Sequence, residues 1–572
     1  MSWKTITGFA LLAATLTVFT VLANGPRRTA STDPQIDWKA VEAAYDPNEV
    51  LTVSWMGPPY SVNATEGGWL QTYLEKRYHL KIKPIFLGGP DYEWKKPMMS
   101  AGGVFVPDVA WEADPINVQM DARNGFIIPI PYELILKHAP SYVRLINETA
   151  PQAWMYSYYR RGGEAVGRNL GVPTIWSDGV YPESPAWRKD WLEKVGIKKV
   201  PRTLEEMHEA LKRFRDEDPD GNGVQDTYGM SASSDAWYRY LDDVFAAFGA
   251  PNDKQGLLPF DWIERDGKIV YGGVMPEARQ ALELLAAWYK EGLIHPDFQL
   301  DRGEDNDRKF LNGKVGYLSH GGVWWAVDPE LDRSMAKDLA ANNPRAAMVM
   351  GPPPQGPNGH RGIRIWGGGG NTMVFGAGVA KKPQLVIRML KMWDEMAAAC
   401  FDKNPDETNV MLVSKCGQRG LHYEYRDGKT PGSGLKTTPE YADANKRSAA
   451  TVGLGLAGGT FFSPCGASVE LTAAFRSREE VAFNDAYRKR QWGAADVFLK
   501  PDVVPSAAKY LKKLREKQMS VYTQIIKGDL KITAFDEFAQ EWHRRGGRQM
   551  TDEANALFQD MNRVYGIVGA RP

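Results

Sequence analysis

Cysteine is almost absent from this chain of 572 residues, which contains only Cys400, Cys416 and Cys465. Three cysteines are too few for a disulfide scaffold, and none shows the CxxC spacing typical of a metal site. One bridge is possible if the protein is exported. Cys400 and Cys416 are the closer pair in sequence, but spacing alone does not fix the pairing.

Neither sign of charge is in excess, because 70 Lys and Arg residues balance 70 Asp and Glu residues. This balance argues against a dedicated nucleic-acid binder or a basic membrane-surface protein. Histidine is scarce, with eight residues, and the sequence has no HExxH helix or GxSxG elbow. It also has no repeat of fixed period, which argues against a repeat-built adhesion or scaffolding protein.

Aromatic residues are abundant, with 19 Trp, 24 Tyr and 21 Phe. Trp and Tyr offer flat apolar faces with a polar edge, a surface suited to a sugar ring. Hydrophobic residues make up 43% of the chain, as in an ordinary globular protein. The length allows two to four domains.

The N-terminus carries the one long apolar run of the sequence, from Ile6 to Ala23. It follows Lys4, and Val21 and Ala23 occupy the −3 and −1 positions of a cleavage site. We therefore predict a signal peptide over 1–23 and a polar linker over 24–45, which places the mature protein in the periplasm or another extracytoplasmic space. An uncleaved membrane anchor is the alternative.

The alternation of apolar and polar residues predicts strands at 50–56, 80–83 and 107–111, with helices near 69–78 and 95–100 between them. This β-α-β-α-β order favours an α/β lobe with a largely parallel sheet. Helical periodicity continues at 276–292, 383–399, 505–526, 533–544 and 552–564, and further strands are expected at 315–318, 347–350 and 373–376.

The clearest helix covers 201–217, where Thr203 and Glu206 form a capping box. It leads into DEDPDGNGVQDTYG at 216–229. Side-chain oxygens at alternate positions of a tight loop converge on one centre, as Ca²⁺ requires. The loop has Gly229 where an EF-hand needs a bidentate Glu, so a regulatory EF-hand is not expected. A structural Ca²⁺ site and a solvated Asx/Gly turn remain the two interpretations. A catalytic metal is disfavoured because no His or Cys cluster joins the loop.

Several motifs of the chain occur together, in the same order, in a known family. They are WRKDWL at 187–192 leading into the DPDGNG loop, KFLNGKVG at 309–316, GPP at 351–353, GQRGLHY at 417–423, and Glu541-Trp542 with Gly546-Gly547 and Glu553-x-Asn555. With these motifs the chain resembles extracellular solute-binding proteins of carbohydrate ABC transporters, in the large subfamily that contains alginate-oligosaccharide-binding proteins.

The resemblance implies an α/β fold of two lobes, the type II periplasmic-binding-protein fold, with mostly parallel sheets flanked by helices and a hinge between the lobes. It also implies a structural Ca²⁺ held by Asp218, Asp220, Asn222, Val224 (through its backbone carbonyl) and Asp226. The family often has a further acidic ligand just after the last Asp, and this chain has Thr227 there.

On this basis we expect lobe one at 46–171 and 347–400, lobe two at 172–346 and 401–545, and a C-terminal helix at 546–572. The expected function is the substrate-binding component of an ABC importer. It would capture an oligosaccharide between the lobes and deliver it to the permease subunits, as a monomer with no catalytic activity and no nucleic-acid partner. The alternative is an exported, calcium-stabilised polysaccharide-degrading enzyme, since a glycosidase needs only two carboxylates that the sequence does not single out.

Ligands of such sheets bind beyond the carboxyl ends of the strands, where loops of the two lobes meet. Aromatic residues after the candidate strands are therefore the expected sugar contacts. Packing in the core is the alternative for each of them. The residues are Trp55, Trp111, Trp176, Trp237, Trp324 and Trp366.

Overall fold

The structure is a computed structural model of the whole chain. It describes residues 34–57, 66–85, 87, 107–160, 167–175, 185–233, 240–250, 256–302, 304–319, 335–365, 369–402, 405–425, 427–429, 435–441 and 492–571. The predicted signal peptide, the helix expected near 95–100 and Cys465 lie outside these residues. No helix within the described ranges is both long and apolar enough to cross a membrane.

The first sheet contains six strands in the order β2-β1-β3-β15-β4, with β7 also paired to β15. The strands are β1 (Leu51–Met56), β2 (Leu80–Ile85), β3 (Val109–Glu112), β4 (Ile127–Ile128), β7 (Val172–Ile175) and β15 (Gly369–Gly376). β1 runs parallel to β2 and β3, whereas β15 runs antiparallel to β3, β4 and β7.

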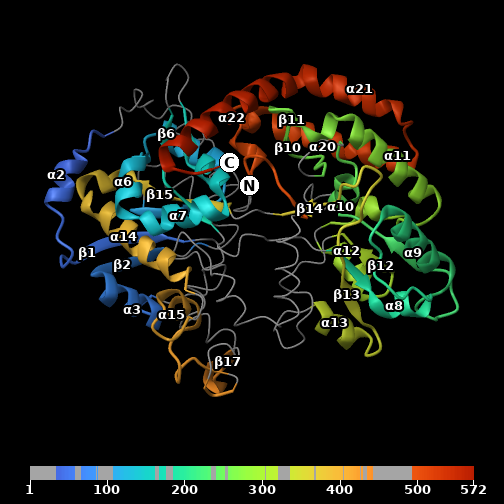
Figure 1. The fold of residues 1–572 in the computed structure, drawn as a ribbon, viewed down its shortest axis with the longest axis horizontal. Coiled ribbons are helices and arrows are strands. Elements are labelled where there is room, and N and C mark those ends of the chain that lie inside the picture. Colours follow the sequence, from blue (N-terminus) through green and yellow to red (C-terminus); the bar gives the residue numbers. More distant parts are fainter. Residues whose placement is uncertain are drawn as a thin grey trace, which may run out of the picture.

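Helices cover this sheet and form the first lobe with it, seen on the left of Figure 1. They are α2 (Trp38–Ala43), α3 (Trp69–Tyr78), α5 (Pro115–Arg123), α6 (Tyr132–His138), α7 (Pro140–Thr149), α14 (Gln384–Ala399) and α15 (Val410–Cys416). Two short ladders, β5 (Tyr158–Tyr159) with β6 (Arg168–Asn169) and β16 (Tyr423–Tyr425) with β17 (Leu435–Thr437), extend it. The central helix α14 is buried on most of its surface because α6, α7 and α15 all pack against it.

The second sheet has four strands in the order β13-β8-β12-β9. They are β8 (Ala186–Arg188), β9 (Tyr228–Met230), β12 (Val315–Leu318) and β13 (Met348–Met350), accompanied by α8 (Lys189–Lys194), α9 (Leu204–Asp216), α10 (Asp242–Ala246), α12 (Asp305–Leu311) and α13 (Met335–Asn342). Trp187 packs 4.4 Å from the Tyr317 ring, and Trp191 packs 5.4 Å from the Phe214 ring. The aromatic residues of the WRKDWL motif therefore form the core of this lobe.

A helical layer completes the second lobe and passes over to the first (Figure 1). It consists of α11 (Pro276–Lys290), α20 (Ala507–Lys527), α21 (Thr533–Trp542) and α22 (Arg548–Val568), together with the hairpin β10 (Trp262–Arg265) and β11 (Lys268–Tyr271). The last helix, α22, contacts β11 in the second lobe and α6 and the turn 151–156 in the first. It therefore ties the two lobes together.

Both sheets are mixed rather than mostly parallel, which corrects that part of the expected fold. In the first sheet β15 is antiparallel to all three of its partners, and in the second β8 is antiparallel to both β12 and β13. The physical reason is connectivity: β15 enters the first sheet from the second lobe and β8 enters the second sheet from the first. Neither strand follows a helical crossover within its own sheet, the connection that makes neighbouring strands parallel.

Strand pairing divides the chain differently from the expected lobe boundaries at three places. β7, expected at the start of lobe two, pairs in the first sheet, and β13, expected in lobe one, pairs in the second. The segment with α15 was expected in lobe two, yet α15 packs on α14, and His422 lies 4.9 Å from the Trp69 ring of α3. The buried apolar side of α15 explains this position, because α14 offers it a matching surface.

Most of the predicted elements are confirmed, including the helix over 69–78 and the strands at 315–318, 347–350 and 373–376. Thr203 caps α9 as expected, with its hydroxyl accepting from the Glu206 amide at 3.2 Å. Glu206 instead accepts from the Arg202 amide, one residue before the position that a capping box predicts. Cys400 and Cys416 are both buried as thiols, so no bridge joins them.

Candidate functional site

The acidic loop over 218–227 connects α9 to β9 on the outside of the second lobe. The loop turns sharply because Asp218, Gly221 and Gly223 have positive φ angles of 45°, 73° and 77°. A Cβ at Gly223 would meet no atom within 4 Å, so the backbone angle is what favours glycine there. This turn geometry places the side chains of alternate loop residues on the same side of the backbone.

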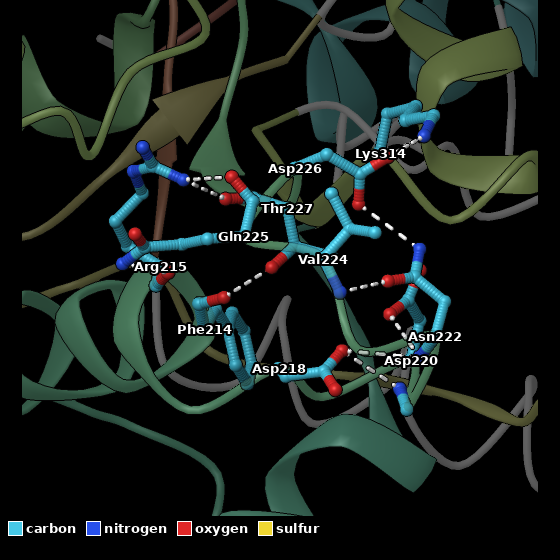
Figure 2. A network of polar contacts seen from close by, with 11 residues as sticks. Phe214, Arg215, Asp218, Asp220, Asn222, Val224, Gln225, Asp226, Thr227 and Lys314 are labelled. Carbon is cyan, nitrogen blue, oxygen red and sulfur yellow. Dashed lines mark hydrogen bonds and ion pairs between the residues drawn. The ribbon is translucent and has the colours of Figure 1, made fainter.

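Three carboxylates of this loop are linked around Asn222 (Figure 2). The Asn222 side-chain amide donates to Asp220 at 3.0 Å and to Asp226 at 3.1 Å. Asp218 accepts from the backbone amides of Gly221, Asn222 and Gly223 at 3.0 to 3.2 Å. The Asn222 side-chain oxygen accepts from the Val224 amide at 2.6 Å.

The charges of the loop perturb one another. Hydrogen bonds from the Asp220 side chain and from backbone amides lower the pKa of Asp218, whereas burial and the Asp218 carboxyl raise the pKa of Asp220. The Lys314 ammonium, placed just before β12, forms an ion pair with Asp226 and lowers the pKa of that carboxyl. A second cation, the Lys194 ammonium, donates to the Asp218 carbonyl at 2.9 Å. Two lysines thus offset part of the loop's negative charge.

Thr227 does not face the centre of the loop. Its buried hydroxyl donates to the Phe214 carbonyl in α9 at 2.6 Å (Figure 2). The Arg215 guanidinium donates to the carbonyls of Gln225 and Thr227 and lies 4.7 Å from the Tyr228 ring. These contacts attach the end of the loop to α9, so the position after the last Asp has a structural role here.

The donor set of the loop fits a hard cation, because three carboxylates, an amide oxygen and a backbone carbonyl are the ligand types that Ca²⁺ prefers. Across the described ranges, no three His, Cys, Asp or Glu side chains already stand in an arrangement that holds a metal. Three of the five expected ligands, Asp218, Asp220 and Asp226, are connected by hydrogen bonds to a fourth, Asn222. The fifth, Val224, donates its backbone amide to the Asn222 side-chain oxygen. The loop places the expected residues close together, but its carboxylates do not converge on one point in the arrangement that coordinates a metal ion.

The connection between the lobes forms a second region of interest. β14 (Ile363–Arg364), just before β15, pairs in parallel with β18 (Gly493–Ala494). The Arg364 guanidinium is buried and lies 2.6 Å from carboxylate oxygens of both Asp242 and Asp261. Burial raises the pKa of Asp242 to about 7, although Arg364 opposes this shift. Arg364 is committed to this internal ion cluster.

Polar groups gather where β3 ends at the edge of the first sheet. Glu112 is buried and accepts from the Asn117 side chain at 3.2 Å, and Asp114 caps α5 by accepting from the Ile116 amide. Lys500, which follows β18, donates to the Ala113 carbonyl and lies 5.0 Å from the Tyr156 ring. Burial lowers the pKa of Lys500 to about 8. Lys500 therefore links the segment after β18 to the first sheet.

Two of the six expected ligand-contacting tryptophans fall in the described part of the chain. Trp55 on β1 is fully buried and Trp111 on β3 is 6% exposed. They lie near the carboxyl ends of neighbouring parallel strands, as expected, but in this conformation both belong to the hydrophobic core. The other four, Trp176, Trp237, Trp324 and Trp366, lie outside the described residues, so their role stays a prediction.

Lys500 and the Asp242–Arg364–Asp261 cluster were not found by sequence reasoning. A single lysine in a loop carries no periodicity or motif. The three members of the cluster are spread over 122 positions of the chain and become neighbours only when α10, β10 and β14 pack together.

The family is shown by a match over residues 61–390, more than half of the chain, to the bacterial extracellular solute-binding protein family. The chain belongs to this family. One relative is the polygalacturonan/rhamnogalacturonan-binding protein YtcQ of Bacillus subtilis (strain 168), which is 23% identical over 403 residues, covering 67% of this chain and 70% of YtcQ.

Solved structures of similar proteins show the same fold. The alginate-binding protein AlgQ2 without calcium ion matches with a TM-score of 0.59 and 16% identity, over 90% of this chain and 98% of AlgQ2. An EF-hand mutant of FusA, the substrate-binding protein of a Streptococcus pneumoniae ABC transporter, in complex with fructo-nystose, matches with a TM-score of 0.60 and 17% identity, over 90% and 99% of the two chains. The expected two-lobed solute-binding fold is thereby confirmed for this solute-binding protein.

Proposed function

We propose that this protein is the substrate-binding component of an ABC importer, capturing an oligosaccharide between its two lobes and delivering it to the permease subunits. The relatives support this proposal, since YtcQ is named for the polygalacturonan and rhamnogalacturonan it binds and FusA is bound to a fructan oligosaccharide. The observation that carries it is the pair of separate sheets, joined by the β14–β18 ladder and by α22.

The mechanism follows from this arrangement. A ligand that touches both lobes stabilises a closed form relative to an open one, and the free energy of closure comes from contacts that only the closed form makes. The parallel β14–β18 ladder has two residue pairs, so it resists bending less than either sheet does. Trp176, Trp237, Trp324 and Trp366 are the proposed stacking surfaces for the sugar rings, and Trp55 and Trp111 support the edge of the first sheet.

A structural Ca²⁺ in the 218–227 loop is part of the proposal. The oxygens of Asp218, Asp220, Asn222, Val224 and Asp226 would hold it. When bound, the ion would offset the negative charge of the three neighbouring carboxylates. It would stabilise the connection from α9 to β9 in the second lobe and take no part in ligand chemistry.

The proposed location is the periplasm or another extracytoplasmic space, reached through the predicted signal peptide over 1–23. We propose a monomer without catalytic activity, since sugar capture by two lobes requires neither a second subunit nor a reacting group. The competing function is an exported polysaccharide-degrading enzyme, and one experiment separates the two.

The mature chain is titrated with a panel of neutral and acidic oligosaccharides in Ca²⁺ buffer while Trp fluorescence is followed, and the recovered sugars are weighed by mass spectrometry. We expect a saturable change with sugars returned intact. The variants W237A and W324A are expected to weaken binding, whereas W38A, on α2 far from the β14–β18 ladder, is the matched control. Shortened or unsaturated sugars would show an enzyme and overturn the proposal.

A further inference from the structure

A groove of about 930 Å³ lies between α20 and the turn that joins α21 to α22. The turn opens because the helix is interrupted at Gly546, whose φ is 119°. A Cβ at this position would come within 2.5 Å of the Tyr510 ring on α20, so the close approach of the two walls requires glycine. The groove is a built feature of the fold, distinct from the region between the lobes.

The walls of the groove are strongly cationic, although the whole chain carries no net charge. Lys509, Lys513 and Lys517 recur every fourth residue on one side of α20, at a spacing of about 6 Å along the helix axis. Three arginines face them from the turn and the start of α22. These are Arg544, Arg545 and Arg548.

Six cations face three carboxylates in the lining, Glu541, Asp552 and Glu553, so the groove keeps a net positive charge. Of the six cations, Arg545 forms an ion pair with Glu541 at 2.7 Å, and within the described ranges the other five form no ion pair. Of the acidic lining residues, Glu553 is occupied by Ser506, accepting from its amide and hydroxyl at 2.7 and 2.6 Å. Burial and the nearby Arg548 lower the pKa of His543, as expected in a positive field. Like charges held together in a concave surface attract anions.

From this geometry we infer that the groove is a second binding site, for an extended oligoanion: an oligosaccharide that carries a carboxylate or sulfate on successive residues. A row of lysines matches charges repeated along a chain better than it matches a single small anion. The concave shape disfavours a flat bilayer surface, which would reach only the rim. This site is independent of the proposed transport site, because it uses neither the tryptophans nor the lobe interface.

The test compares binding of a size-defined sulfated hexasaccharide to the full mature chain and to two triple variants. K513Q/K517Q/R548Q removes three charges from the groove, and K198Q/K199Q/K212Q removes three exposed charges elsewhere in the second lobe. We expect the groove variant to bind about tenfold more weakly, the control to bind as wild type does, and added salt to weaken wild-type binding. Equal binding by all three proteins, or an equal loss in both variants, would overturn the inference.

Two further probes separate the sources of the anion. Inorganic phosphate that displaces the hexasaccharide as effectively as a second hexasaccharide does would show a single-anion site and contradict the inference. Phosphatidylglycerol vesicles are the second probe. If the vesicles bind wild type but not the groove variant, and the hexasaccharide binds neither protein, the groove is a membrane-binding site and the inference is wrong. The Trp fluorescence response to a neutral transport ligand is measured in parallel. We expect it to be unchanged in the groove variant, so failure of the groove and failure of the proposed function remain distinguishable.

Discussion

The side-chain amide of Asn555 on α22 pairs with the backbone of Ile269 on β11 as a neighbouring strand would. It accepts from the Ile269 amide at 2.9 Å and donates to the Ile269 carbonyl at 2.8 Å. Trp542 stacks on the Tyr271 ring at 4.8 Å in the same hairpin. Both residues belong to the C-terminal motif of the family resemblance, so this motif attaches the last helices to the second lobe.

The variant N555A should therefore destabilise the protein. It removes the side-chain partner of both the amide and the carbonyl of Ile269, and an unsatisfied polar group of this kind costs about 1–3 kcal/mol. The measurement is urea unfolding followed by circular dichroism. N562A, on an exposed position of the same helix, is the control for helix propensity. Equal stability of the two variants would show that the pairing with Ile269 contributes nothing.

Calcium is expected to raise the melting temperature through the 218–227 loop. The double variant D218N/D220N should melt in Ca²⁺ buffer near the temperature that wild type shows with a chelator, because amides replace two of the three carboxylates. E205Q/E209Q removes two exposed carboxylates of α9 and should keep the full response to Ca²⁺. A wild-type melting temperature that is indifferent to the chelator would remove the calcium proposal.

Lys314 is expected to compete with calcium, because its ammonium pairs with Asp226. The variant K314Q should bind Ca²⁺ more tightly, by up to about fivefold, since a partly exposed ion pair contributes at most about 1 kcal/mol. Isothermal titration with CaCl₂ measures the dissociation constant. The control is K212Q, because Lys212 is exposed. K309Q would not serve, because Lys309 forms its own ion pair with Asp301 and its loss would disturb that pair. Weaker Ca²⁺ binding by K314Q would mean that the lysine organises the site.

The Asp242 carboxyl should make stability depend on pH. Burial raises its pKa from 3.8 to about 7, so between these values the folded state binds more protons than the unfolded state. Its stabilising contribution is complete below about pH 4 and disappears as the pH rises through 7. The stability of D242N relative to wild type should therefore improve from pH 4 to pH 7.5, measured by thermal melting.

The partly exposed Asp305 provides a control of opposite sign. The Arg302 amide lowers the pKa of Asp305, so this carboxylate stabilises the folded state above its ordinary pKa, and the contribution is lost as the pH falls. The stability of D305N relative to wild type should worsen as the pH rises. A D242N difference that is flat with pH would show that Asp242 stays ionised.

Arg388 on α14 anchors the segment before β1. Its buried guanidinium donates to the Tyr45 hydroxyl and to the carbonyls of Asp46, Glu49, Tyr78 and His79, at 2.7 to 3.0 Å. R388Q should lower the free energy of unfolding by about 2–4 kcal/mol, because several buried carbonyls lose their donor. K391Q, one turn away and exposed, should change it by no more than about 0.5 kcal/mol. Limited proteolysis near residues 45–49 should accelerate only in R388Q.

Local physics sufficed for the elements that carry strong periodicity or capping signals. The helix over 69–78, the Thr203 cap of α9 and the alternation in β1 follow from side-chain spacing alone, and the structure contains all three. The acidic loop is also local, since its glycines set the turn and its Asp and Asn residues bond to neighbouring amides. The sequence therefore determined the α/β class, the position of the loop and the family.

Other features required the tertiary structure, because they join residues that no local pattern relates. Strand direction depends on which lobe the chain comes from, so β8 and β15 made both sheets mixed. The Arg364 cluster, the Lys500 contact and the Asn555 pairing each join segments more than 100 positions apart. The cationic groove likewise exists only where the turn at Gly546 meets α20. Sequence fixes propensities within a few turns of chain, whereas burial and charge pairing between distant segments depend on how the lobes pack.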